Sequence, residues 1–103
     1  MDDARLAKAV ELVQQKMDGQ DAFGSTVRFD FGDGSAVFVD GNASPPKATP
    51  DSETEADCTI TAEEEVFQEL IEGELDPTAA FMTGKIKIDG SMGAAMAVSR
   101  ALG

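Results

Sequence analysis

Residues 79–102 read AAFMTGKIKIDGSMGAAMAVSRAL, and three structural patterns follow one another in this stretch without a gap. The pair Asp76-Pro77 precedes it and is typical of a helix start, because an aspartate side chain accepts from free helical amides and proline fits the first turn. We therefore expect a short helix that begins at Pro77. It should end at Gly84, since glycine readily adopts the left-handed conformation that closes a helix.

A strand is expected next. Residues 85–89 read KIKID, so polar and apolar side chains alternate with a period of two. Ile86 and Ile88 should then point to one face of a sheet and the lysines to the other. Gly90 allows a tight turn after this strand, and Ser91 can cap the amides that follow it.

The last residues show helical periodicity. Five positions make one stripe at helical spacing: Met92, Ala95, Met96, Ser99 and Leu102. We expect the chain to end as an amphipathic helix whose inner face consists of methionine and small residues. Methionine is unbranched and polarizable, so it adapts to irregular or exchangeable apolar partners better than leucine does.

The N-terminal half predicts a helix followed by a hairpin. Residues 3–17 carry an apolar stripe of helical period. Residues 26–31 and 35–40 alternate as two strands, with a turn at residues 32–34. Residues 41–55 include three prolines, which favours an exposed loop with at most a short edge strand near Lys47.

A second strand and helix pair is expected in the middle of the chain. Residues 58–61 have a strand pattern, and Thr61 with Glu64 predicts a capping box that starts a helix ending at Gly73. Cys58 is the one cysteine, so it forms no disulfide within the chain, and its strand position favours a buried, inert thiol.

Length and composition indicate one domain that spans residues 1–103. The sequence contains no apolar run near the roughly 20 residues that a membrane span needs. It begins Met1-Asp2-Asp3 where a secretory signal would be basic and then apolar, and Ala101-Leu102-Gly103 is not a Ser-Lys-Leu peroxisomal signal. We therefore expect a cytoplasmic protein without stable membrane insertion.

The chain is strongly acidic, with 20 acidic and 8 basic residues and a net charge of −12. Such a field repels polyanions, so nucleic acid is not expected as a partner. Residues 51–84 hold 11 acids and no lysine or arginine. This segment is interpreted as a solvated face that maintains solubility. Two alternatives stay open: the Asp51–Asp76 acidic face docks a basic protein, or it is an adaptation to a salty habitat.

Catalysis is not expected. The sequence contains no histidine and no tyrosine, which removes the commonest general base and the usual catalytic triads. It also has no phosphate-binding loop and no zinc-ligand spacing. Asp51, Glu53 and Glu55 lack the glycine and spacing of a calcium loop. We accordingly expect neither an enzyme, nor a cofactor, nor a metal ion.

The run from Asp76 to Leu102 resembles the C-terminal signature of the sterol carrier protein type-2 (SCP-2) domain family of small intracellular lipid carriers. The matching elements are Asp76-Pro77, the segment from Ala80 to Ile88, Gly90, Met92-Gly93 and Ala95-Met96, with Asp57–Thr61 upstream. The resemblance implies an α+β fold: a five-stranded, mostly antiparallel sheet covered on one face by helices. It also implies an apolar tunnel between the layers that holds a fatty acid, acyl-CoA, phospholipid or sterol.

The apolar residues of the chain can line such a tunnel without a polar handle, because tryptophan and tyrosine are absent. The expected ligand-binding residues are Met17, Phe23, Phe38, Phe67, Leu70, Leu75, Phe81, Met82, Met92 and Met96. Phe81, Met82, Met92 and Met96 are favoured, and the terminal helix is expected to move for ligand entry. The predicted function is non-covalent lipid carriage.

Two other classes of protein stay open. Ser91 after Asp89-Gly90 faintly resembles the attachment site of a phosphopantetheine acyl carrier, although such carriers are helical bundles and this chain has strands. The stronger competitor is an acidic protein-interaction module with a filled core, which docks a basic partner or a lipid-handling enzyme. That alternative predicts salt-sensitive partner binding and no cavity.

Overall fold

The structure is a computed structural model that describes residues 2–102. Its elements follow the order α1 (Asp3–Met17), β1 (Thr26–Asp30), β2 (Ala36–Asp40), β3 (Lys47–Pro50), β4 (Cys58–Ala62), α2 (Glu64–Ile71), α3 (Pro77–Met82), β5 (Ile86–Gly90) and α4 (Met92–Leu102). The sequence features noted above at Met1 and Gly103 lie outside the described residues.

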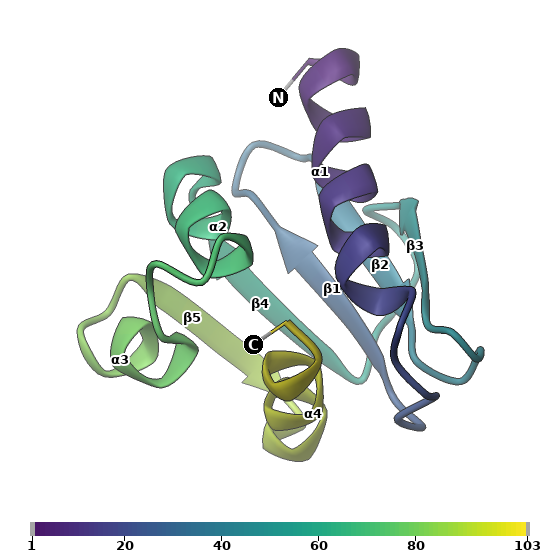
Figure 1. Ribbon diagram of the computed structural model, residues 1–103. Helices are drawn as coiled ribbons and strands as arrows, with labels where there is room; N and C mark the ends of the chain where they lie inside the picture. Colours follow the sequence, from purple (N-terminus) through teal and green to yellow (C-terminus); the bar gives the residue numbers. More distant parts are fainter. Residues whose placement is uncertain (1, 103) are drawn as a thin grey trace.

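The five strands form one sheet in the order β3-β2-β1-β4-β5 (Figure 1). The central pair β1 and β4 is parallel, and the other three pairs are antiparallel. Two parallel strands need a long connection between them. Here the connection from β1 to β4 contains β2 and β3, which extend the sheet on the other side of β1. The predicted mostly antiparallel sheet is confirmed.

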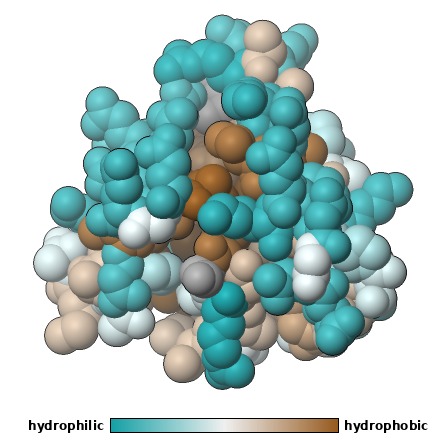
Figure 2. Space-filling model, viewed as in Figure 1, coloured by the Kyte–Doolittle hydropathy of each residue, from teal (hydrophilic) through white to brown (hydrophobic). Residues whose placement is uncertain are grey.

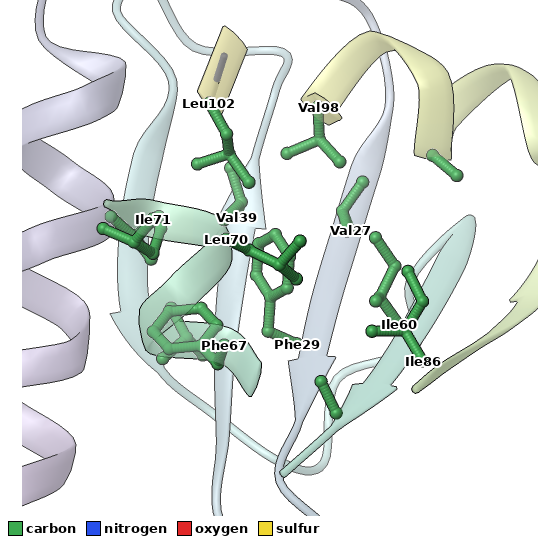
Figure 3. Close-up of a cluster of buried hydrophobic side chains, with 14 of the residues drawn as sticks. Val27, Phe29, Val39, Ile60, Phe67, Leu70, Ile71, Ile86, Val98 and Leu102 are labelled. Atoms are coloured by element: carbon green, nitrogen blue, oxygen red, sulfur yellow. The ribbon is translucent and has the colours of Figure 1, made fainter. Parts of the chain in front are cut away.

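Helices cover one face of this sheet. Figure 1 shows α1 over β2 and β3, with α2 and α4 over the middle strands and α3 beside β5 at the edge. The side chains under the helices are apolar, because alternate residues of each strand point to that face. Figure 3 shows this core, in which Val27 and Phe29 of β1 meet Val98 and Leu102 of α4 and Phe67 of α2.

The opposite face of the sheet is not covered by helices and carries mostly polar side chains. Arg28 lies there, as its alternation with Val27 predicts, and its guanidinium donates to the carbonyl of Thr54 at 2.8 Å and to Thr59 Oγ1 at 3.3 Å. These bonds attach the 51–55 loop to the back of the sheet, away from the helical layer.

Helix α1 is attached to the edge strand β3 through one glutamine. The Gln14 side-chain amide donates to the Pro46 carbonyl at 3.1 Å, and its Oε1 accepts from the Ala48 amide at 2.8 Å. The short edge strand predicted near Lys47 is present, and Gln14 of the helix bonds its Ala48 amide and the carbonyl of the preceding Pro46.

Most of the predicted element boundaries are confirmed, but the capping box is wrong. Thr61 is a residue of strand β4, and α2 begins two residues later than a box at Thr61 requires, with Glu63 at the cap position and no side-chain cap bond. Thr61 fits the strand because its partner Lys87 continues the pairing of β4 with β5. The pairing of β4 with β5 thus determines where helix α2 begins.

None of the helices within residues 2–102 is both long enough and apolar enough to cross a bilayer.

Candidate functional site: an apolar groove between α3, β5 and α4

A groove of about 400 Å³ lies between α3, β5 and α4. It is open to solvent on one side. Its three walls are consecutive elements of the C-terminal part of the chain. The lining residues are Asp76, Pro77, Thr78, Phe81, Ile88, Met92, Ala95, Met96, Ser99 and Arg100. In Figure 2, moderately apolar residues gather in the lower part of the molecule, over α3 and α4, while hydrophilic residues cover α1 and α2.

Helix α3 forms one wall of the groove. It begins as predicted, with the Asp76 carboxylate accepting from the Ala79 amide at 3.3 Å and Pro77 in the first turn. Ala80 is fully buried and holds the helix against the protein. The neighbouring residue Phe81 therefore points away from the core and toward the groove, and 43 % of its surface stays exposed. Gly84 closes the helix with a φ of 77°.

Strand β5 contributes Ile88 to the groove. Ile88 pairs with the buried Ile60 of β4 and therefore points to the face that the helices cover. It is only half-buried, whereas Ile86, on the same face, is buried. The helical layer thus leaves part of β5 uncovered between α3 and α4.

Helix α4 forms the other wall, and the structure corrects the face predicted for it. Its start is as expected, since Ser91 Oγ accepts from the Ala94 amide at 3.2 Å. The residues buried against the sheet are Ala94, Ala95, Val98 and Leu102. Of the predicted stripe, Ala95 and Leu102 are on this buried face. Met92 and Met96 lie beside it and line the groove, with 48 % and 55 % of their surfaces exposed.

Small residues explain why the methionines are not buried. Ala94 and Ala95 let α4 approach the sheet closely, and Val98 fills the space beneath the next turn. With the helix seated on these residues, the longer methionines have no room underneath and extend sideways. Large apolar side chains left exposed together mark a binding surface more often than an ordinary surface.

Two charged residues line the groove, Asp76 and Arg100. Asp76 is engaged at the start of α3, where it accepts from the helix amide. Arg100 forms no ion pair or hydrogen bond through its side chain with any residue between 2 and 102. The hydroxyls of Thr78 and Ser99 add two polar groups to an otherwise apolar lining.

Of the ten residues expected to bind ligand, the structure brings Phe81, Met92 and Met96 to this groove. Met82 follows Phe81 on α3 but does not line the groove, and 79 % of its surface is exposed. For the residues outside the groove, contact with a ligand stays a prediction.

Three of the expected residues are packed in the core. Met17 and Leu70 are buried, and Phe67 makes edge-to-face contacts with Phe29 and Phe31 at centroid distances of 5.5 and 4.9 Å. Such aromatic pairs stabilise a core. These side chains already have apolar partners in the described structure.

The remaining three lie elsewhere. Phe38 is on the uncovered face of the sheet, opposite the helices, because its register partner is Arg28 and its neighbours Val37 and Val39 take the buried face. Phe23 and Leu75 are half-buried at the rim of the core. The Phe23 ring packs so closely on Gly41 that a Cβ there would lie 2.3 Å from it.

Sequence reasoning missed several lining residues, and a signal for some of them was present. Ser99 and Arg100 follow Met96 by three and four residues, which places them next to it on a helix surface. Arg100 is not part of the predicted apolar stripe of this helix, and no role was predicted for it.

A second, smaller cavity of about 110 Å³ lies between α1 and α2, next to the Arg5–Glu64 ion pair. Elsewhere, burial raises the pKa of the Cys58 thiol, and the nearby carboxylate of Asp89 raises it further. Cys58 is fully buried in β4, as predicted. Within residues 2–102, no cluster of three or more potential metal-ligating side chains is found.

Comparisons with known proteins agree with the fold. The model of the SCP-2 sterol transfer family matches residues 23–103. Sterol carrier protein 2 of Homo sapiens is 49% identical over 47 residues, which are 46% of this chain and 9% of that protein. Hydroxysteroid dehydrogenase-like protein 2 of Xenopus tropicalis is 40% identical over 50 residues, 48% of this chain and 12% of that protein. The chain thus matches a small part of these longer relatives.

Solved structures have the same architecture. The sterol carrier protein domain 2 of Helicoverpa armigera aligns with a TM-score of 0.73 and 25% identity, over 95% of this chain and 87% of that one. Sterol Carrier Protein-2 of Aedes aegypti, solved in complex with the C16 fatty acid palmitate, aligns with a TM-score of 0.75 and 14% identity, over 95% and 94% of the two chains. With its family model covering most of its length and its fold matched throughout, this chain belongs to the SCP-2 sterol transfer family.

Proposed function

We propose that this protein is a non-covalent lipid carrier that holds an apolar chain in the groove between α3, β5 and α4. The observation that carries the proposal is the cluster of exposed apolar side chains there, with Phe81, Met92 and Met96 around a space of about 400 Å³. That volume is within the range of about 300–1,000 Å³ that is usual for small-molecule sites. A fold shared with a palmitate-bound protein supports the same proposal.

The energetics suit a carrier. Burial of a methylene group contributes about 0.8 kcal/mol, so even part of an acyl chain gains several kcal/mol before the costs of association and ordering. The groove is open along one side, which leaves a route for entry and release without unfolding. The apolar tunnel implied by the family resemblance is one extension of this groove, reached if α4 moves.

No covalent step is required by this function. The chain provides a binding surface, shields the apolar part of its cargo from water, and releases it to an acceptor. We propose that residues 1–103 act as one SCP-2-like domain in the cytoplasm, with no cofactor and no enzymatic reaction of their own.

Native mass spectrometry tests this function. The protein is analysed as purified, then after delipidation and incubation with fatty acids and acyl-CoAs of increasing chain length. We expect an additional mass of a few hundred daltons that is lost on denaturation and restored by particular chain lengths. A protein that takes up nothing across the series would contradict lipid carriage.

A pair of variants tests the location. Met96→Asp places a charge in the groove and should lower the affinity for a fluorescent fatty acid at least tenfold, because a carboxylate cannot be desolvated against an acyl chain without cost. Met82→Asp is the matched control, since Met82 is on a neighbouring wall but outside the groove. Equal losses in both variants would place the lipid elsewhere.

A basic protein partner at the Asp51–Asp76 acidic face is a second proposal. Within residues 2–102, Glu64 is the acid of this segment that forms an ion pair, with Arg5, and three aspartates accept hydrogen bonds from nearby groups: Asp51, Asp57 and Asp76. The other glutamates of the segment form no ion pair with a residue between 2 and 102. Calorimetric titration with a lysine-rich peptide at low and high salt tests it. Binding that is absent at low salt would exclude this role.

A further inference from the structure

We propose that Arg100 selects cargo with an anionic head group, so that the groove prefers a single-chain anionic amphiphile over a neutral lipid of equal length; this rests on the lipid-carrying function proposed above. The chemistry recognised is a carboxylate or phosphate next to an unbranched apolar chain. Arg100 is the residue of the groove that carries a positive charge.

The spacing on α4 gives the cargo a direction. Met92, Met96 and Arg100 are separated by four residues each and therefore lie in one row along the helix. With a rise of about 1.5 Å per residue, the row extends about 12 Å from Met92 to Arg100. An acyl chain that packs along the two methionines would bring its head group to the guanidinium at the C-terminal end of the row.

The charges of the groove favour an anion at that end. Asp76 is the other charged lining residue, and its carboxylate is already bonded to the Ala79 amide at the positive end of α3. Arg100 forms no ion pair or side-chain hydrogen bond with a residue between 2 and 102, so its N–H donors are open to a ligand. A guanidinium binds carboxylates and phosphates through paired N–H donors, and the adjacent Ser99 hydroxyl can donate a further bond.

The negative charge of the whole protein makes the positive charge of Arg100 important for binding an anion. A net charge of −12 repels an approaching fatty-acid carboxylate at long range. A cation inside the groove offsets that repulsion where the ligand is held. Because Arg100 is exposed, we expect its contribution to affinity to be about three- to tenfold.

The test compares ligands that differ in the head group alone. Affinities of the delipidated protein for palmitate, hexadecanol and palmitoyl lysophosphatidate are measured by competition with a fluorescent fatty acid. In Arg100→Gln, the affinity for palmitate should fall three- to tenfold, while that for hexadecanol changes less than twofold. A larger loss for the lysophosphatidate than for palmitate would identify phosphate as the preferred head group.

Two further variants keep the inference open to refutation. Lys85→Gln removes an exposed cation outside the groove, so palmitate affinity should be unchanged apart from a small salt-dependent effect. Asp76→Asn retains a good helix cap and removes a negative charge, so palmitate affinity should rise and hexadecanol affinity should not.

The outcomes separate this inference from the function. If the unmodified protein binds palmitate and hexadecanol and Arg100→Gln lowers both equally or neither, the head-group role of Arg100 is refuted and lipid carriage stands. If the unmodified protein binds none of the three ligands, both are refuted. Thermal unfolding of each variant confirms that the comparison is made on folded protein.

Discussion

Met17 and Met96 are side chains of the same type in two different surroundings. Met17 ends α1 and is fully buried, in a core to which the sheet and the helices α1, α2, α3 and α4 all contribute. Met96 is in the middle of α4, two residues from the buried Val98, and 55 % of its surface is exposed. The region of α1, β1 and β2 thus satisfies its apolar side chains internally, whereas the region of α3, β5 and α4 does not.

This difference separates structural from functional apolar residues. A methionine that already has apolar neighbours contributes to folding, and its removal leaves a cavity. A methionine at the groove has lost little contact with water on folding, so its gain comes when a ligand covers it. Residue type does not distinguish the two cases, but position relative to the small residues beneath the helix does.

The largest expected difference in stability is between the alanine variants of the two methionines. Met17→Ala should lower the free energy of unfolding by about 2–5 kcal/mol, because a buried side chain leaves a cavity. Met96→Ala should lower it by less than about 0.5 kcal/mol, as is usual for exposed positions. Urea denaturation of the delipidated protein measures both values.

In a lipid-binding assay the order of the two effects should be reversed, with the larger loss in Met96→Ala. Met96→Ala is expected to weaken fatty-acid binding, and Met17→Ala should bind normally wherever it is folded. If the two variants were equally destabilised without lipid, the groove would be part of the core and the contrast between the regions would be lost.

Two glycines around Ser91 give an intermediate effect. Gly90 has a φ of 101°, and a Cβ there would lie 2.4 Å from the Asp57 carbonyl oxygen, so Gly90→Ala should cost about 1–3 kcal/mol. Gly93 lies in α4, where a Cβ would meet Ser91 Oγ at an ordinary 3.6 Å. Gly93→Ala should therefore stabilise the protein by up to about 1 kcal/mol.

Calorimetry of these two variants shows how firmly the groove wall is held. Opposite signs would indicate that the backbone leading into α4 holds the conformation seen in the structure. A stabilised Gly90→Ala would mean that the turn adopts another conformation.

The smallest expected effect is a pH dependence from Cys58. Burial raises its pKa, so the native thiol stays neutral at pH values where the thiol of the unfolded chain, with a pKa of about 8.5, ionises. Above that pH the unfolded state binds fewer protons than the native state, so stability falls as pH rises toward the native pKa. Below the pKa of the unfolded thiol, the contribution of Cys58 to stability does not change with pH.

Cys58→Ala provides the comparison, since lysines and the amino terminus titrate in both proteins. The difference in unfolding free energy between the two should shrink as the pH rises from 8 to 10, the range set by that unfolded thiol. A constant difference would indicate that the thiol ionises equally in both states.

Much of the fold could be predicted because its signals are local. The Asp76-Pro77 start, the alternation from Lys85 to Asp89 and the Ser91 cap each depend on neighbours in sequence, and each is confirmed. The capping box at Thr61 failed because pairing with β5 extends β4 through that residue. Long-range pairing of this kind leaves no mark on the sequence around a helix start.

The site was harder to predict for a related reason. The periodicity of α4 identified the row that includes Met92 and Met96, but it could not show whether that row meets the sheet or passes beside it. Ala94 and Val98, each two positions from Met96, decide the matter because they are buried against the sheet. Phe38 was similarly assigned from its residue type, although the alternation of β2 puts it on the opposite face.

The bond between Gln14 and the edge strand β3 has a consequence for how the protein behaves at high concentration. An unpaired strand edge is a template on which a second chain can add and aggregation can begin. Here the Gln14 amide occupies the Ala48 donor and the Pro46 acceptor, and Pro46 and Pro50 lack amide donors of their own. A protein that presents exposed methionines to its cargo thereby offers fewer free backbone groups at this edge of its sheet to copies of itself.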